Sequence, residues 1–237
     1  MAALWDRHAR RYQRFEHLEP KVEASRAVRG VQPELGLSPF ESCGYTLFSN
    51  SGPFTAFFVR WTVPHLVFVP EPLNINLFHT FVGLGFLDIH VEMTVDSAQN
   101  VTSVLWLGSV GQVMNLPIVP GDDISASLCL DTNPAGTAHY FVANETTGQT
   151  VNFTVDTGLP PAVTIDAGVT RGLVDNNPTL SPLARFGVVY FDEISAFSTG
   201  GSQSLTAGQA VAMTDSNGST LASPVRLTDY AFKVVYG

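Results

Sequence analysis

The chain has 237 residues, of which 45% are hydrophobic and only 14% are charged, and this composition excludes a disordered polyelectrolyte. The length allows one large β-domain or two small domains, and we expect one domain. Residues 1–30 hold seven of the twelve Lys and Arg residues against four acids, which leaves five bases against seventeen acids in the rest of the chain. Because a body with a net charge of about −12 repels phosphates, nucleic acid is not expected as a partner.

Residues 4–29 are the one stretch with helical composition, and Pro20 should interrupt a helix there. The apolar residues of this stretch form only a poor stripe, and residues 30–44 have the Gly, Pro and Ser content of a linker. We therefore expect residues 1–43 to be a basic N-terminal extension and linker, helical or disordered, with a helix that docks on a partner as the alternative.

The sequence carries opposing signals about its location. No run approaches the roughly 18 to 20 apolar residues of a bilayer-spanning helix, so no membrane association is expected, and no signal peptide is visible. Four Asn-x-Ser/Thr sequons instead hint at a secretory history; they begin at Asn100, Asn144, Asn152 and Asn217. Localisation is therefore left open.

From Gly44 onward, short β-rich runs alternate with turn residues at intervals of roughly ten, which is typical of a β-sandwich or barrel. Residues 44–237 are expected to form this domain. The clearest local prediction is a hairpin, because a turn that ends in Gly148 joins two alternating runs. The expected strands are GYTLFSN, FTAFFVRWTV, HTFVGLGF, DIHVEMTV, SVLWLG, QVMNLPI, DISASLCLD, AHYFVAN, QTVNFTV, AVTID, RGLVD, ARFGVVYFDEISAF, QAVAMTD and DYAFKVVY.

Ionisable residues alternate with apolar ones in LDIHVEM, so Asp88, His90 and Glu92 should share one strand face. As ligands they would spread over about 13 Å, too far for one ion, and no metal or cofactor is expected. Cys43 and Cys129 allow at most one disulfide and form no metal pattern.

Several stretches, taken in order, resemble the glutamic peptidases, the eqolisin family of acid endopeptidases. They cover about residues 44–237 and are FVRWTVP (58–64), HTFVGLGF (79–86), VLWLG (104–108), VPGDDISASL (119–128), ANETTGQTVNFTV (143–155) and PLARFGVVYFDEISA (182–196). The resemblance implies an all-β fold, a concanavalin-like double-sheet sandwich with a concave substrate cleft. It also favours an extracellular location.

Eqolisins use a glutamine and a glutamate as their catalytic dyad, and the resemblance implies that both are substituted here. His90 falls at the glutamine position, and matching RGLVDN places Arg171 at the glutamate and Asp175 at a later acid. A histidine can still donate to an oxyanion, but a guanidinium stays protonated and cannot act as a base. If VTIDAGV is the matching strand instead, Asp166 brings a shorter carboxylate to the cleft, so Asp166 and Asp175 are the alternative bases.

Trp61 and Trp106 can be interpreted either as core residues or as walls of the substrate cleft. By residue type alone, Trp61 and Trp106 belong in a core, whereas family tryptophans line the substrate groove, so the resemblance makes both cleft candidates beside Asp88 and Glu92.

Three functions remain open from the sequence. The leading hypothesis is an eqolisin-fold protein with a degenerate dyad that binds a peptide or another extended ligand. The alternatives are an active acid endopeptidase that uses His90 with Asp166 or Asp175, and a lectin-like or structural sandwich with a glycan as its ligand.

Overall fold

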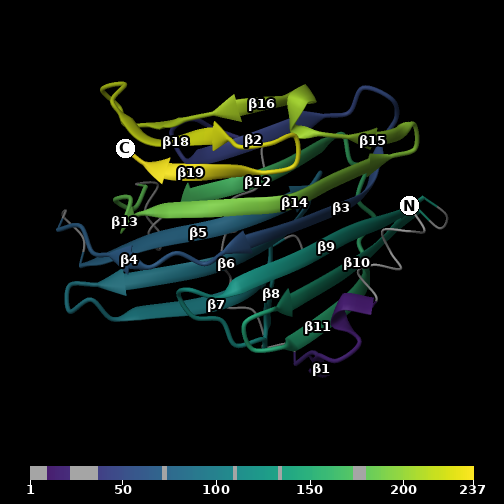
Figure 1. Cartoon of the computed structure of the whole chain (residues 1–237), viewed down its shortest axis with the longest axis horizontal. Helices are drawn as coiled ribbons and strands as arrows, with labels where there is room; N and C mark the ends of the chain where they lie inside the picture. The colour runs from purple at the N-terminus through teal and green to yellow at the C-terminus, as the bar shows by residue number, and fades with distance from the viewer. Residues whose placement is uncertain (1–9, 22–36, 71–73, 109–110, 133–134, 173–179) are drawn as a thin grey trace.

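The computed structural model describes residues 10–21, 37–70, 74–108, 111–132, 135–172 and 180–237, and it is an all-β sandwich (Figure 1). This confirms the predicted fold class. The N-terminal segment contributes one helical turn at residues 10–12 and the strand β1 (Glu16–His17). Among the described residues, no helix is long and apolar enough to cross a membrane.

The larger sheet contains ten strands in the order β1-β11-β10-β9-β3-β14-β19-β18-β17, with β15 beside β14. After β1, its members are β3 (Phe54–Thr62), β9 (Asp123–Thr132), β10 (Ala135–Asn144), β11 (Gln149–Asp156), β14 (Val188–Ser198), β15 (Gly201–Gln203), β17 (Met213–Thr214), β18 (Thr220–Arg226) and β19 (Phe232–Tyr236).

The smaller sheet contains seven strands in the order β16-β2-β12-β5-β6-β7-β8. Its members are β2 (Ser42–Phe48), β5 (Ile75–Leu84), β6 (Leu87–Asp96), β7 (Val101–Leu107), β8 (Gln112–Met114), β12 (Thr164–Arg171) and β16 (Gly208–Val211). A two-stranded pair, β4 (Leu66–Val67) with β13 (Arg185–Phe186), and the 3₁₀ turn η2 (Leu205–Ala207) complete the elements.

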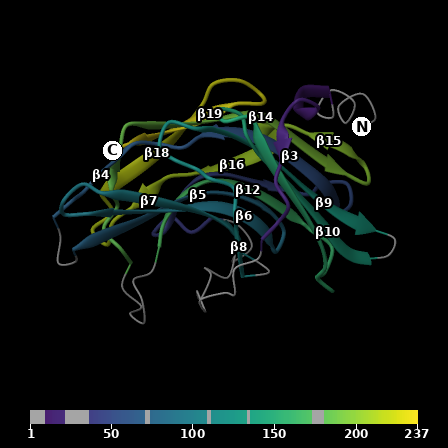
Figure 2. The ribbon, with the colours of Figure 1, turned by 90° about the horizontal axis from the view of Figure 1, so that it is seen from below.

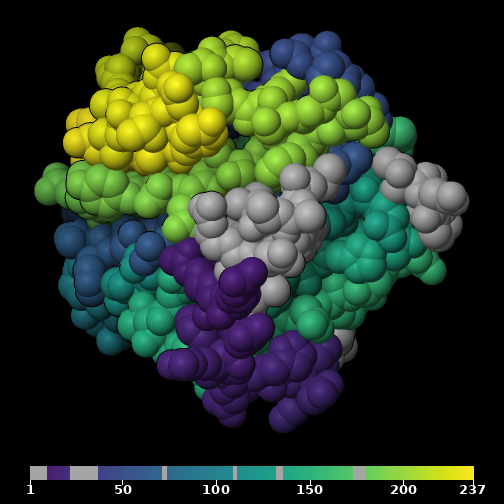
Figure 3. Space-filling model, turned by 45° about the vertical axis from the view of Figure 1, so that its right-hand side comes forward, coloured from purple at the N-terminus to yellow at the C-terminus, as the bar shows by residue number. Residues whose placement is uncertain are grey.

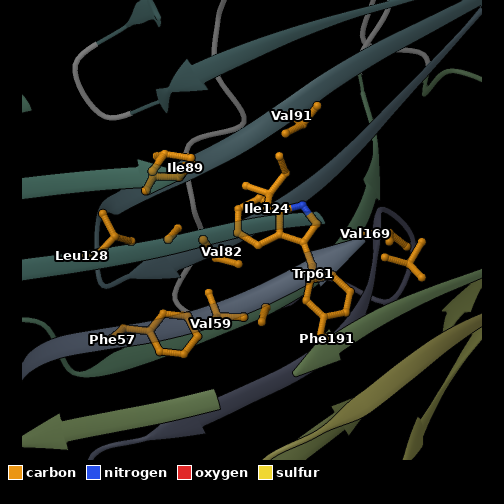
Figure 4. Close-up of a cluster of buried hydrophobic side chains, with 14 of the residues drawn as sticks. Phe57, Val59, Trp61, Val82, Ile89, Val91, Ile124, Leu128, Val169 and Phe191 are labelled. Atoms are coloured by element: carbon orange, nitrogen blue, oxygen red, sulfur yellow. The ribbon is translucent and has the colours of Figure 1, made fainter. Parts of the chain in front are cut away.

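The two sheets stack face to face and curve in the same direction (Figure 2). The seven-stranded sheet lies on the inner side of the curve, so its outward face is the concave one. One hydrophobic core fills the space between the sheets, drawing on Phe57 and Trp61 from the larger sheet and Ile89 and Val169 from the smaller (Figure 4).

Strand β6 shows how alternation positions the concave face. Its odd-numbered residues from Leu87 to Val95 are fully buried in the core, and its even-numbered residues are only half-buried. Because successive side chains of a strand point to opposite faces, Asp88, His90 and Glu92 share the outward face, as predicted.

The predicted hairpin of residues 138–155 is confirmed, with β10 and β11 antiparallel and Gly148 at φ +71°. Two other strand predictions were wrong. The runs AVTID and RGLVD were separated at Gly168, but that glycine lies inside a single strand, β12. A Cβ at Gly168 would lie 2.2 Å from the carbonyl oxygen of Cys43, so the residue serves a close approach of two strands and not a turn. Strand β18 was missed because it contains Pro224.

The N-terminal segment binds along the ten-stranded sheet. Strand β1 pairs in parallel with β11, and the Arg11 guanidinium contacts Glu145 at 2.6 Å and Glu193 at 2.8 Å. Figure 3 shows this segment, in purple, lying on the surface beside β10 and β11. The helical content in residues 10–21 is one turn, and the remainder of 4–29 lies outside the described residues.

Candidate functional site

The concave face of the seven-stranded sheet carries a continuous set of polar side chains. We call it the polar face; its defining residues are Thr46, His79, Gly83, Asp88, His90, Glu92, Trp106 and Asp166. Residues directly opposite on neighbouring strands point to the same side of a sheet, so the strand register identifies the members of this face.

Three rows of paired residues run across the strands. The first joins Asp88, Gly83, Asp166 and Thr46 from β6, β5, β12 and β2. The second joins Trp106, His90, Phe81 and Gly168 from β7, β6, β5 and β12. The third joins Glu92, His79 and Thr170 from β6, β5 and β12.

His90 is held by two neighbours. Its Nδ1 lies 2.8 Å from Asp88 Oδ2, and its ring stacks on the indole of Trp106 with centroids 6.2 Å apart and an interplanar angle of 16°. A carboxylate beside Nδ1 makes that nitrogen the N–H donor, so Nε2 is the ring nitrogen left to bind another group.

His79 belongs to the same group, although its residue type alone indicated an ordinary strand position. Its ring centroid is 5.1 Å from that of His90, and its Nε2 is 3.4 Å from Glu92 Oε2. Burial lowers the pKa of His79. The signal for this pairing was present in the sequence, because a two-residue turn at Gly85 and Phe86 puts His79 opposite Glu92.

Asp166 lies on the polar face, one strand away from Gly83 and two from Asp88. Only 5% of the residue is exposed, and Thr46 Oγ1 donates to its Oδ1 at 2.5 Å. Burial raises the pKa of the Asp166 carboxyl to about 6, against the opposing effect of the Thr46 and Thr164 hydroxyls. Asp166 is therefore a carboxyl group that changes charge under mildly acidic conditions.

Arg171 is on the same strand but does not join this group. It follows Asp166 by five positions, and an odd separation along a strand reverses the face. Its register partner is Phe78, which is fully buried on the core side, and its Nε donates to the carbonyl oxygen of Phe40 at 2.9 Å. The structure brings Asp166, and not Arg171, to the face of His90. The other proposed acid, Asp175, lies outside the described residues.

The two tryptophans separate. Trp61 is 1% exposed between the sheets, where its Nε1 donates to Thr80 Oγ1 at 2.9 Å across the sandwich, so its indole belongs to the core (Figure 4). Trp106 lies on the polar face against His90, and its buried Nε1 has no hydrogen-bond partner among the described residues. A buried indole N–H without a partner is a donor available to a bound acceptor.

Glycines make room for the acids of the first row. A Cβ at Gly108 would lie 2.2 Å from Asp88 Oδ2, so only glycine admits the carboxyl group there. A Cβ at Gly83 would make ordinary contacts, the nearest at 3.4 Å, and 3.8 Å from the Cβ of Asp166. Because Gly83 has no side chain, the β5 residue of this row leaves the position between Asp166 and Asp88 unfilled.

Other sites have less support. In the described part of the chain, no group of three or more His, Cys, Asp or Glu residues could hold a metal ion. Both cysteines are free: Cys43 is in the core and Cys129 faces away from it. A pocket of about 220 Å³ beside Arg60 and Tyr190 lies on the ten-stranded sheet, away from the polar face.

A second group of residues, on the ten-stranded sheet, has the residue types of a catalytic triad but cannot act as one. Cys129 is opposite His139, and His139 contacts Asp131, in the order of a nucleophile, a base and an acid. Both ring nitrogens of His139 are engaged, Nε2 with Asp131 at 3.0 Å and Nδ1 with Thr154 at 3.1 Å. Burial raises the pKa of the Cys129 thiol to about 12, so no thiolate is available.

Comparison with known proteins connects the fold to one family. The model of the Peptidase A4 family matches residues 41–236. A search of curated protein sequences finds no match.

Solved structures of that fold superpose over nearly their full lengths. Scytalido-glutamic peptidase with a peptide-based transition state analog has a TM-score of 0.66 and 16% identity, covering 84% of this chain and 98% of its own. SCP-B, an eqolisin in complex with the tripeptide Ala-Ile-His, has a TM-score of 0.64 and 17% identity, again covering 84% of this chain and 98% of its own. Aspergilloglutamic peptidase from Aspergillus niger has a TM-score of 0.56 and 18% identity, covering 68% of this chain and 99% of its own. At such identities the likeness establishes the fold.

Proposed function

This chain belongs to the peptidase A4 family, the glutamic peptidases, and we propose that it is an endopeptidase for mildly acidic conditions in which Asp166 replaces the glutamate as general base. The observation that carries the proposal is the position of Asp166 on the same sheet face as His90, with a pKa raised to about 6. Arg171, on which the expectation of a degenerate dyad rested, has the opposite strand parity from Asp166.

The proposed step is attack of water on a peptide carbonyl. Ionised Asp166 accepts a proton from the water, and the same carboxylic acid later returns it to the leaving amine. A base of pKa about 6 is ionised near that pH, so the rate rises with pH through about 6. The optimum therefore lies above that of a peptidase whose base has an ordinary carboxyl pKa.

His90 supplies the hydrogen bond to the developing oxyanion. With Nδ1 engaged by Asp88, the imidazolium form of His90 presents Nε2–H as the donor toward the substrate. The gap above Gly83, between Asp166 and the Asp88–His90 pair, is where the water and the carbonyl carbon would lie.

An extended peptide fits this face. The solved relatives include one bound to a peptide-based analog and one bound to a tripeptide. In this chain, the unpartnered Nε1 of Trp106 offers a donor to a peptide carbonyl, and the stacked rings of Trp106 and His90 offer an apolar surface. Peptide binding without turnover is the second candidate, favoured by the burial of Asp166.

The test is hydrolysis of a quenched-fluorescent peptide library and denatured casein from about pH 3 to 8. Asp166→Ala should lower turnover by roughly 10²- to 10⁴-fold, and His90→Ala by roughly 10²- to 10³-fold. Arg171→Gln, on the same strand but the other face, is the matched control and should retain activity. Binding of the library peptides without cleavage at any pH would support the second candidate instead.

A further inference from the structure

The Asp166 carboxyl is linked through one hydroxyl group to the backbone ahead of the first strand of its sheet. Thr46 Oγ1 donates to Asp166 Oδ1 at 2.5 Å, and the Leu37 N–H donates to the same Oγ1 at 3.2 Å. Thr46 and Asp166 are direct partners on β2 and β12, and both are buried. A relay therefore runs from the Leu37 amide to the Asp166 carboxyl.

The relay has a direction. A threonine hydroxyl carries one proton and accepts through its oxygen lone pairs. The Thr46 hydroxyl donates its proton to Asp166, and the Leu37 N–H that donates to the same oxygen polarises the O–H group and strengthens that bond. Hydrogen bonds donated to a carboxylate favour its ionised form, so the relay opposes the effect of burial on Asp166.

No charged side chain of the adjacent strands duplicates this role. Strands β2 and β16 carry no ionisable acid or base on their outward faces. Among the described residues in the three rows of the polar face, the other titratable groups are Asp88, His90 and Glu92 on β6 and His79 on β5. Gly83 separates Asp166 from the nearest of them in its row.

We propose that Thr46 is a positioning residue for Asp166 and that the segment at Leu37, acting through Thr46, keeps the Asp166 carboxyl ionised. Loss of the Leu37 contact makes the Thr46 hydroxyl a weaker donor to Asp166 and so favours the protonated carboxyl. A consequence for catalysis rests on the proposed function, in which Asp166 is the general base. In that case the segment at Leu37 regulates turnover, because it changes the fraction of Asp166 that is ionised.

The test is a carbon-13 NMR titration of the Asp166 carboxyl in the full chain. Thr46→Val removes the hydroxyl at nearly constant volume and should raise the pKa of Asp166 by about one unit. Thr46→Ser keeps the donor and should leave it unchanged. Leu37→Pro removes the amide proton and should shift the pKa in the same direction by a smaller amount. Leu37→Ala, which also loses the leucine side chain but keeps that proton, is its control and should not shift the pKa.

The titration reads the carboxyl whether or not the protein cleaves peptides, so it is separate from the test of the proposed function. An unchanged pKa in Thr46→Val would overturn the proposal. If that variant does not fold, the Leu37→Pro and Leu37→Ala pair decides, and equal pKa values in the two would overturn it. If turnover is found, the acid limb of kcat/KM should shift upward in Thr46→Val with the measured pKa.

Discussion

His90 Nδ1 lies 2.8 Å from Asp88 Oδ2, and this contact determines which ring nitrogen faces the open side of the polar face. A carboxylate partner orients the imidazole. The pair is formed within one strand, by residues two apart on the same face.

Asp88→Asn should disturb this arrangement without removing the ring. The substitution replaces a charged acceptor by a neutral amide, so we expect the population of His90 protonated on Nδ1 to fall and turnover to drop by at least about tenfold. Nitrogen-15 NMR of the histidine ring measures the tautomer directly. Unaltered ring shifts together with unaltered turnover would contradict the role given to Asp88.

Gly83→Leu should block the proposed reaction space while preserving the sheet. A Cβ at this position makes only ordinary contacts, but the longer side chain would lie between Asp166 and Asp88. We expect a loss of kcat/KM of at least about 10²-fold with little change in the denaturation midpoint. Gly83→Ala, which adds only the tolerated Cβ, is the control.

Asp166 should make stability depend on pH. Its folded pKa of about 6 is raised above an ordinary unfolded value near 3.9, so its contribution is present below about pH 4 and is lost as the pH rises through about 6. The loss amounts to about 3 kcal/mol. Denaturant unfolding at pH 4 and pH 7 should show this difference between the wild type and Asp166→Asn, whose amide does not titrate. Parallel pH profiles for the two proteins would exclude the raised pKa.

Trp61 and Trp106 should respond differently to substitution by phenylalanine. Trp61→Phe leaves a cavity and an unpaired Thr80 hydroxyl between the sheets, so we expect a loss of about 2 to 3 kcal/mol in the free energy of unfolding. Trp106→Phe removes an N–H that has no partner in the described structure and should cost less stability while weakening peptide affinity. Denaturation and peptide titration of both variants distinguish the two roles.

The two thiols should be unreactive in the folded protein. Burial raises the pKa of both Cys43 and Cys129 to about 12, so neither forms a thiolate near neutral pH. We expect a chromogenic disulfide reagent to titrate two thiols quickly in denaturant and slowly without it. Recovery of no free thiol under denaturing, non-reducing conditions would mean that the cysteines are oxidised.

Local patterns were sufficient for most of the fold. Alternation along residues 87–96 predicted which side chains leave the core, and a glycine-ended turn predicted the hairpin of β10 and β11. The errors in the strand predictions occurred at glycine and proline, which are found both in turns and within strands. Gly168 was left out of the expected strands although it permits close strand packing within β12, and β18, which contains Pro224, was not predicted.

By itself, the sequence determined the all-β class, the family and the shared face of Asp88, His90 and Glu92, because strand periodicity is a local property of the chain. Only the tertiary structure shows which of Asp166 and Arg171 shares the face of His90. That choice depends on β12 being one unbroken strand and on its register against β5, and register is set by contacts between segments about eighty residues apart. The same long-range pairing puts Thr46 on Asp166 and Trp61 in the core, and no spacing along the chain contains that information.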